Sequence, residues 1–227
     1  MKLEDSVDLL RRLQACKLDV TARDPRWWPD SGSFRMVVGA ILTQQTRYQK
    51  VEESLQRLQA VGEISPERLL TMEAEQLRQC IQPSGFYRVK AGRLQWLARN
   101  LLEVFGDFET FQRQVDREWL LRQQGVGNET ADAILCYGCH REAMVVDAYT
   151  ERLLRSFGLR FRGYLPLQAW LADGIEKGWD EVQQLLPGKS LAEVHALYHG
   201  LIVEYAKRHS HGKTIDVAAL SHASSGA

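Results

Sequence analysis

The fold of this chain is decided by residues 118–149, EWLLRQQGVGNETADAILCYGCHREAMVVDAY. The turn Gly125-Val126-Gly127 joins two helical segments, and its glycines let backbone N–H groups approach an anion while the next helix opens toward it. The apolar run 143–146 then leads to Asp147, the first charge after four residues that need burial. A carboxylate at such a place either caps a helix or takes part in chemistry. The stretch therefore predicts a phosphate-binding turn followed by one candidate catalytic carboxylate.

Helical periodicity runs through most of the chain, and no segment alternates convincingly between apolar and polar residues as a half-buried strand does. We therefore predict an all-α fold. Residues 36–42 are apolar on every side, which predicts a buried central helix. Pro166 is among the breakers expected between helices. The expected helices cover residues 4–17, 33–45, 47–60, 66–71, 73–81, 86–105, 108–114, 117–123, 129–138, 147–157, 167–177, 179–186 and 190–208.

The composition is that of a folded protein, since 44% of the 227 residues are hydrophobic and 26% are charged. No apolar stretch approaches the ~20 residues of a membrane helix, and the N-terminus lacks the order of a signal peptide. We therefore expect a cytoplasmic protein without membrane contact. The four cysteines are expected to be reduced. Cys136 and Cys139 form a CxxC, but no second pair with zinc-finger spacing accompanies them, which favours helix packing.

Basic residues are distributed unevenly, although the chain has 29 basic and 29 acidic residues and no net charge. That balance argues against binding of nucleic acid by bulk charge alone. Residues 85–100 contain four basic residues and no acid, and four arginines lie within residues 152–162. Each stretch is either a solvated helix face or part of a local phosphate-binding surface, and the sequence leaves both interpretations open.

Four motifs occur in order along the chain, at residues 42–46 (LTQQT), 83–91 (PSGFYRVKA), 125–131 (GVGNETA) and 145–147 (VVD). Together they resemble the helix–hairpin–helix DNA glycosylases, the superfamily that includes endonuclease III. The resemblance spans roughly residues 28–207. It implies excision of a damaged base that has been flipped out of double-stranded DNA, by a two-lobed fold with a cleft between the lobes.

The resemblance also suggests how the chain is divided. A central lobe that carries the hairpin is expected at residues 30–135. The second lobe is expected to combine residues 1–29 with residues 136–210. Residues 211–227 are expected to form a tail, because their small and polar end is of the kind that frays.

Two departures from the family pattern narrow the expected activity. Bifunctional members carry a lysine two residues after the second hairpin glycine, where its amine attacks the sugar, whereas this chain has Glu129 there. Many endonuclease III relatives bind an iron–sulfur cluster through cysteines near the C-terminus, whereas no cysteine follows Cys139 here. The resemblance therefore implies a monofunctional glycosylase that needs no cluster or other cofactor. Within the superfamily, the chain most resembles the cluster-free bacterial 3-methyladenine DNA glycosylases, which remove alkylated purines.

Asp147 falls on the family's catalytic aspartate. An alkylated, positively charged purine leaves as a neutral base, so the enzyme needs only negative charge beside the developing oxocarbenium and a positioned water. One carboxylate can supply both, although Asp147 is also suited to cap the next helix. Electron-rich rings suit a cationic base, each contact contributing about 0.5–2 kcal/mol. The candidates for this base pocket are Trp27, Trp28, Pro29 and Tyr48. The alternative is core packing for the two tryptophans and the shaping of a turn for Pro29.

Base flipping leaves a gap in the stack that a side chain must fill. By resemblance Gln44 fills this gap, and Phe86 is a second candidate on the opposite strand. The alternatives are a polar contact at a helix end for Gln44 and a core position for Phe86.

The hairpin is expected to bind a DNA phosphate through the amides of Gly125, Val126 and Gly127, and a monovalent cation can accompany them as in the family. Asn128 is expected to cap the following helix. Glu129 would repel a phosphate unless it points away or only supplies a charge at the helix start. Phosphate contacts are also expected from Arg88 and Lys90.

Two other functions stay open. An endonuclease III-like enzyme would excise oxidised or mispaired bases, and the absence of the lysine and the cluster counts against it. A non-catalytic module would only bind DNA, and Asp147 beside an aromatic pocket counts against that. His195 and His199 have the i, i+4 spacing of zinc ligands, but no third ligand accompanies them, so no metal is expected. We expect a monomer whose partner is double-stranded DNA with a damaged base.

Overall fold

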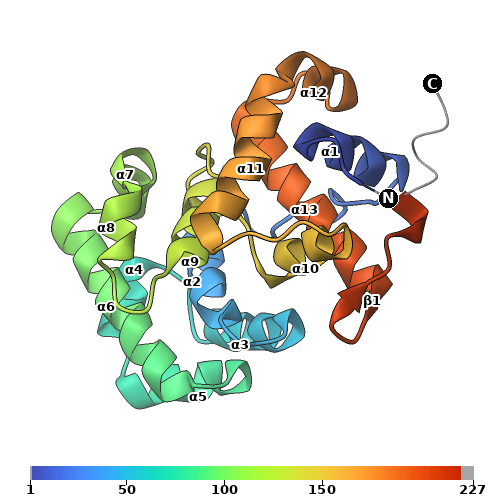
Figure 1. The fold of residues 1–227 in the computed structure, drawn as a ribbon. Coiled ribbons are helices and arrows are strands. Elements are labelled where there is room, and N and C mark those ends of the chain that lie inside the picture. The colour runs from blue at the N-terminus through green and yellow to red at the C-terminus, as the bar shows by residue number, and fades with distance from the viewer. Residues whose placement is uncertain (1, 221–227) are drawn as a thin grey trace. The chain divides into compact units, whose positions relative to one another are not determined.

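The protein is helical almost throughout, which confirms the all-α prediction. Among residues 2–220, which a computed structural model describes, thirteen α-helices (α1–α13) are joined by loops of different lengths, and the strands form one small two-stranded sheet (Figure 1). The chain divides into two compact units. The central unit is Asp30–His140, and the terminal unit combines the residues before it with those after it.

The central unit is built around α2 (Phe34–Thr43). Ser33 caps this helix by accepting a hydrogen bond from the Met36 amide. The side chains of Met36, Val37, Val38, Ile41 and Leu42 are at most 1% exposed, as expected for a helix that is apolar on every side. Packed against α2 are α3 (Tyr48–Ala60), α6 (Tyr87–Phe105), α9 (Asn128–Ala133) and the π-helix η2 (Ile134–Gly138). The unit also contains α4 (Pro66–Thr71), α5 (Ala74–Ile81), the 3-10 helix η1 (Gln82–Ser84), α7 (Phe108–Gln114) and α8 (Arg117–Leu121).

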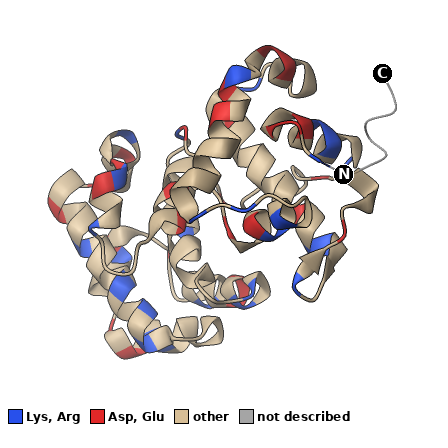
Figure 2. Cartoon of the chain, in the orientation of Figure 1, with Lys and Arg blue, Asp and Glu red and all other residues tan. Residues whose placement is uncertain are grey.

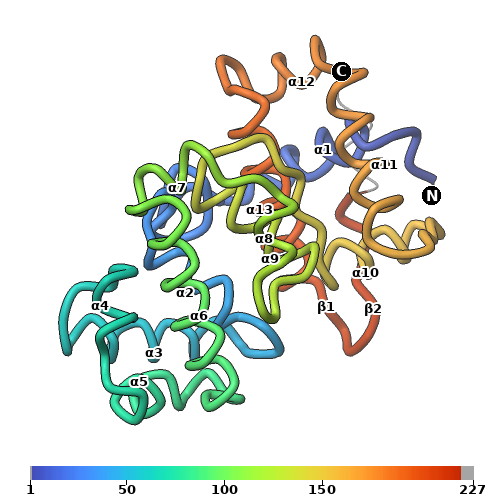
Figure 3. The backbone as a smooth tube through the Cα atoms, turned by 90° about the vertical axis from the view of Figure 1, so that its left-hand side faces the viewer, coloured from blue at the N-terminus to red at the C-terminus, as the bar shows by residue number. Residues whose placement is uncertain are grey.

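The terminal unit has its own core, to which both ends of the chain contribute. Its elements are α1 (Ser6–Ala15), α10 (Ala148–Ser156), α11 (Tyr164–Lys177), α12 (Trp179–Leu185), α13 (Leu191–His209), β1 (Ser210–His211), β2 (Thr214–Ile215) and the 3-10 helix η3 (Ala218–Leu220). The long helix α13 packs on both α1 and α10 (Figure 3). Leu9, Leu154, Tyr198 and Ile202 are fully buried in this core. Within the described part of the chain, no helix has the combination of length and apolar character that spanning a membrane requires.

The structure corrects the expected boundary and the expected tail. Residues 136–140 belong to the central unit, because η2 packs on α2 and Gln112 donates a 2.7 Å hydrogen bond to the Gly138 carbonyl. Residues 211–220 are not a loose tail, since Ile215 and Leu220 are 3% and 0% exposed in the terminal core. Residues 221–227 lie outside the described part. Helix α11 also begins before Pro166, because a proline in a first turn lacks only an N–H that has no partner there.

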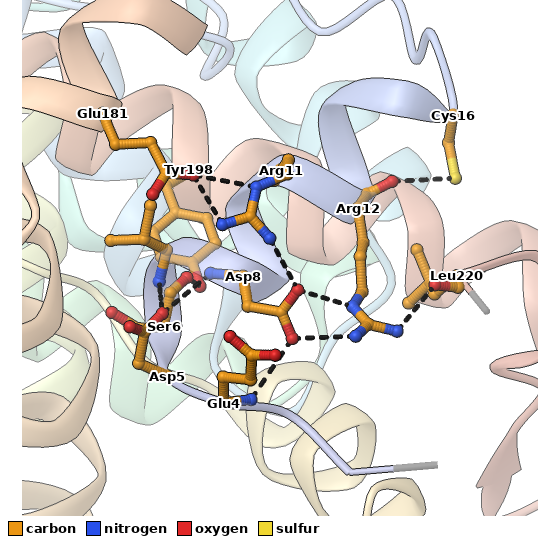
Figure 4. Close-up of polar contacts among 11 residues, drawn as sticks. Glu4, Asp5, Ser6, Asp8, Arg11, Arg12, Cys16, Glu181, Tyr198 and Leu220 are labelled. Atoms are coloured by element: carbon orange, nitrogen blue, oxygen red, sulfur yellow. Dashed lines mark hydrogen bonds and ion pairs between the residues drawn. The ribbon is translucent and has the colours of Figure 1, made fainter. Parts of the chain in front are cut away.

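A buried ion pair fixes α1 within the terminal unit (Figure 4). Asp8 and Arg12 are 2% and 7% exposed, and Nε and Nη2 of Arg12 donate to Oδ1 and Oδ2 of Asp8, both at 2.9 Å. Arg12 Nη1 also donates to the Leu220 carbonyl at 3.2 Å. Burial alone would raise the pKa of Asp8, but the hydrogen bonds and charge of Arg12 outweigh it and the pKa is lowered. The pair therefore links the first helix to the last described residue.

Replacing Arg12 with Met should destabilise the protein strongly, because Asp8 would stay buried with only the partly exposed Arg11, whose Nη1 lies 2.9 Å from Oδ1, as its counter-charge. The free energy of unfolding, measured in urea, should fall by about 3–5 kcal/mol. Adding Asp8→Asn to the same variant should recover part of this loss. The control is Arg57→Met, because Arg57 is 46% exposed and pairs with Glu53 at the surface; its effect should stay within about 1 kcal/mol. Equal losses in the two variants would show that the buried pair is not needed.

The hairpin is the turn between α8 and α9, and its two glycines differ. Gly125 has a φ of +74°, in the left-handed region, and a Cβ there would lie 2.2 Å from Nε of Arg93. Gly127 is the N-cap of α9, with a φ of −99° and open space around its α-carbon. Between them Val126 is buried, with 7% exposure. Only the first glycine is therefore demanded by the backbone conformation.

Two matched serine variants test this difference. Gly125→Ser should lower the free energy of unfolding by about 1–2 kcal/mol, because a side chain in the left-handed region is strained and Arg93 must move. Gly127→Ser should change it by less than about 0.5 kcal/mol or raise it slightly, because serine is a preferred N-cap residue. Thermal or urea unfolding of both variants would measure this, and equal losses would refute the assignment.

Candidate functional site

Asp147 lies at the N-terminus of α10, where its two carboxylate oxygens have different surroundings. Oδ1 accepts hydrogen bonds from the backbone N–H of Thr150 at 2.8 Å and from its hydroxyl at 3.0 Å. The Thr150 hydroxyl in turn accepts from the Asp147 N–H, which completes a capping box. Oδ2 lies 3.7 Å from Nε2 of His199. Asp147 thus caps α10 with one oxygen, while the other is held in a fixed position.

The surroundings of Asp147 favour the ionised carboxylate. Its side chain is only 15% exposed, and burial alone would raise its pKa. The His199 ring and the two donors of Thr150 outweigh burial, so the pKa of Asp147 lies below its usual value. The group is therefore negatively charged at neutral pH, as electrostatic stabilisation of a cation requires.

Trp27 is anchored on α13 in the same unit. Its indole N–H donates to Glu204 at 3.2 Å, and its ring stands at 90° to the His199 ring, with 5.2 Å between the ring centroids. Gly200 allows this approach, because a Cβ there would lie 2.5 Å from Cγ of Trp27. The ammonium of Lys207 lies 5.5 Å from the centroid of the Trp27 ring. Trp27 and Asp147 are therefore both neighbours of His199.

The remaining candidates for the base pocket fall in different parts of the chain. Trp28 is half-buried and meets Trp27 edge to face, with 5.9 Å between the centroids. Pro29 follows at the end of the first segment of the terminal unit. Tyr48 belongs to the central unit, where it is the first residue of α3 and is half-buried. The structure thus gathers Asp147, His199, Trp27 and Trp28 in one unit and places Tyr48 in the other.

Gln44 and the hairpin contact each other within the central unit. The Gln44 amide donates to the Gly125 carbonyl at 2.8 Å and to the Thr130 hydroxyl at 3.1 Å. Its Oε1 accepts from Nη1 of Arg93 at 3.0 Å. The side chain expected to fill a gap in DNA is thus held beside the hairpin in the structure.

The structure corrects the role expected for Asn128. The helix begins at this residue, its N-cap is Gly127, and no side-chain hydrogen bond caps it. The side-chain oxygen Oδ1 of Asn128 instead accepts a hydrogen bond from Nη2 of Arg117 at 2.9 Å. Arg117 also binds both oxygens of Asp132, at 2.7 and 3.1 Å. Asn128 therefore braces the two hairpin helices. Glu129 is exposed in the first turn of α9, where its charge suits the helix dipole.

Phe86 and Arg88 lie at the surface at the start of α6. Phe86 is 66% exposed and its φ is +48°, so a large apolar side chain is displayed from a strained backbone position. Arg88 is exposed on the same helix, along which Lys and Arg recur (Figure 2). The core position considered for Phe86 is therefore wrong.

Lys90 does not match its expected role as a phosphate contact. It is 2% exposed, and Nζ donates to the Leu42 carbonyl, the Thr46 hydroxyl and the Ser84 carbonyl, each at 2.8 Å. A lysine ammonium has three N–H donors, so none remains for a phosphate. The burial of Lys90 was not predicted, because the sequence of a basic stretch does not show which of its side chains point into the protein.

The histidines on α13 do not form a metal site with the other described residues. Within residues 2–220, no group of three or more His, Cys, Asp or Glu side chains is arranged to hold a metal ion. Both ring nitrogens of His195 are buried without a hydrogen-bond partner, and burial lowers its pKa to about 4. His195 is therefore a neutral core residue, whereas His199 lies beside Asp147. His199 and the neighbouring Gly200 both contact Trp27, whereas the sequence had raised only a zinc-ligand spacing at His199.

Comparison with known proteins identifies the family. The model of the HhH-GPD superfamily base excision DNA repair proteins matches residues 38–162. A candidate DNA repair glycosylase of Methanocaldococcus jannaschii is 31% identical over 220 residues, which are 93% of this chain and 93% of that protein. Endonuclease III of Thermotoga maritima is 32% identical over 192 residues, which are 84% of this chain and 80% of that protein.

Solved structures show the same fold. H. pylori 3-methyladenine DNA glycosylase bound to 1,N6-ethenoadenine superposes with a TM-score of 0.87 at 37% identity, over 91% of this chain and 99% of that one. A non-covalent endonuclease III–DNA complex superposes with a TM-score of 0.65 at 20% identity, over 95% and 92% of the two chains. The two-lobed helical fold expected from the sequence is thus confirmed. The chain belongs to the HhH-GPD superfamily of base excision DNA repair proteins and is a DNA glycosylase.

Proposed function

We propose that this DNA glycosylase is monofunctional and removes alkylated purines of the 3-methyladenine type, leaving an abasic site. The observation that carries the proposal is the fixed, ionised carboxylate of Asp147, combined with a carboxylate at the position of the lyase lysine. Glu129 has no amine that could attack the sugar. Asp147 is therefore the group that acts on the glycosidic bond, and water is the nucleophile.

The reaction needs little from the protein beyond this charge. As the C1′–N bond breaks, its electron pair leaves with the base, which was cationic and becomes neutral. The sugar develops oxocarbenium character, and Oδ2 of Asp147 stabilises it. A water attacks C1′ and gives its proton to the carboxylate or to solvent, so the products are the free base and an abasic site. His199 keeps the carboxylate charged and in place until the water attacks.

Two further observations support alkylated purines as substrates, and a third concerns the cofactor. Trp27 and Trp28 lie in the same unit as Asp147, and indole faces suit a cationic base. The H. pylori glycosylase with a TM-score of 0.87 is described as acting on 3-methyladenine. The four cysteines, at positions 16, 80, 136 and 139, are free thiols spread over both units rather than grouped near the C-terminus. We propose that the reaction proceeds without an iron–sulfur cluster or other cofactor.

DNA is held, in this proposal, by the central unit. The exposed backbone at Gly125 and Gly127 binds a phosphate, and a monovalent cation can share this site. Arg88 binds a second phosphate. Phe86 enters the base stack from its exposed position. The Gln44 amide breaks its hydrogen bond to the Gly125 carbonyl and fills the gap that the flipped base leaves.

The Asp147→Asn variant tests the chemical role of the carboxylate. Asparagine caps helices as well as aspartate does, so α10 should keep its start while the charge is lost. Release of base from methylated duplex DNA should slow by about 10²–10⁴-fold. The released base, identified by mass spectrometry with the wild-type enzyme, distinguishes alkylated purines from oxidised or mispaired bases. Full activity in the variant would refute the mechanism.

A matched control is available for this variant. Asp107 also caps a helix, α7, by accepting from the Thr110 amide at 2.7 Å. Asp107→Asn should leave base release within about twofold of wild type, since it removes a capping charge of the same kind away from Asp147.

Borohydride trapping tests the absence of lyase chemistry. Reduction during turnover links enzyme to DNA only when an amine has formed a Schiff base with the sugar. The wild-type protein should give no covalent adduct on a denaturing gel. Glu129→Lys, which places an amine at the family's lyase position, should give one. An adduct with the wild-type protein would contradict the monofunctional assignment.

A further inference from the structure

The buried ammonium of Lys90 lies where two loops meet in the central unit. One loop follows α2 and carries Gln44 between Leu42 and Thr46. The other, η1 with the residues after it, carries Phe86 two residues after Ser84. Lys90 binds both loops: two of its hydrogen bonds go to the first and one to the second, each at 2.8 Å.

Further hydrogen bonds, besides those of Lys90, hold the two loops at this junction. The Thr46 hydroxyl also hydrogen-bonds to the Ser84 carbonyl and to the Gln44 carbonyl. The Leu42 carbonyl is in the last turn of α2, where carbonyls lack intrahelical donors and accept from lysine. The Ser84 hydroxyl donates to the Ile81 carbonyl at 2.7 Å. The two loops therefore share one hydrogen-bonded centre.

Burying a lysine ammonium at such a centre has an unfavourable free energy of desolvation. Lysines are almost never fully buried, and the three hydrogen-bond acceptors of Lys90 are uncharged. Burial, together with the nearby charge of Arg93, lowers the pKa of Lys90 to about 8. An apolar side chain of similar volume would fill the space without this cost, but it would remove the Lys90 donor from the Leu42 and Ser84 carbonyls and leave the Thr46–Ser84 hydrogen bond to join the two loops.

We propose that Lys90 is a positioning residue for base flipping, which holds the Gln44 loop and the Phe86 loop at a fixed separation so that both side chains enter DNA together. Arg93, one turn further along α6, continues this support, because it binds Oε1 of Gln44 and lies against Gly125. The proposal rests on the proposed function, since it assigns Gln44 and Phe86 to the flipped state of the DNA.

The test compares two DNA duplexes that differ at one site. One carries a tetrahydrofuran abasic analogue with 2-aminopurine beside it, and the other carries a normal pair there. Wild-type protein should bind the abasic duplex more tightly and raise its 2-aminopurine fluorescence, because inserted side chains unstack the neighbouring base. Lys90→Met should weaken binding to the abasic duplex by about tenfold, the effect of one or two lost hydrogen bonds, and abolish the fluorescence rise. Binding to the normal duplex should stay within about twofold, since it depends mainly on phosphate contacts.

Two further variants complete the design. Thr46→Val keeps the shape of the loop but removes one acceptor of Lys90, so it should show the same selective loss to a smaller degree and carries the test if Lys90→Met does not fold. Lys50→Met removes an exposed lysine of the same unit that pairs with Glu53, and it should bind both duplexes like wild type. Equal weakening toward both duplexes, or no weakening, in Lys90→Met and Thr46→Val would overturn the proposal. If the wild-type protein does not distinguish the duplexes, the proposed function itself has failed.

Discussion

The capping box at Asp147 is the interaction on which the rest of the site depends. The backbone N–H groups at the start of α10 need an acceptor, and Oδ1 supplies it. This requirement fixes the rotamer of Asp147 and leaves Oδ2 on the side of His199. The capping of α10 thus orients the carboxylate that we propose acts on the glycosidic bond. The helix N-terminus also favours negative charge, so the fold supports the ionised state that the chemistry uses.

In the central unit, several basic residues hydrogen-bond to other parts of the protein. Lys90 joins two loops, Arg93 binds Gln44, and Arg117 binds Asp132, whose side chain is only 1% exposed. Counting charges therefore overstates the basic surface available to DNA. A protein with no net charge can nevertheless hold phosphates with backbone N–H groups, which carry no formal charge and appear in no composition.

The sequence predicted the helices well, because periodicity and capping residues are local. Helices such as α4 and α7 have the expected bounds, and the buried character of α2 follows from its composition alone.

The site was harder to predict. Asp147 was recognised because a charge after an apolar run stands out. The role of Lys90 was missed because its partners Leu42 and Thr46 lie 48 and 44 residues away. Asn128 precedes a predicted helix, as an N-cap residue would. The helix instead begins at Asn128, whose side chain binds Arg117. The packing of residues 211–220 depends on the apolar side chains Ile215 and Leu220, which are too widely spaced to form a periodic pattern.

The joining of both chain ends in the terminal unit has a consequence for synthesis. Helix α1 leaves the ribosome before the central unit does, but the helices that bury Leu9 and Tyr198 together are not complete until α13 has been made. The central unit is continuous in sequence, so it can fold before the helices that pack on α1 have been synthesised. Asp147 and Trp27, which lie on opposite sides of this inserted unit in the sequence, come together only at the end. The unit that we propose binds DNA can therefore fold before the unit that carries the proposed catalytic carboxylate, and a chain that stops before α13 would lack the assembled terminal unit.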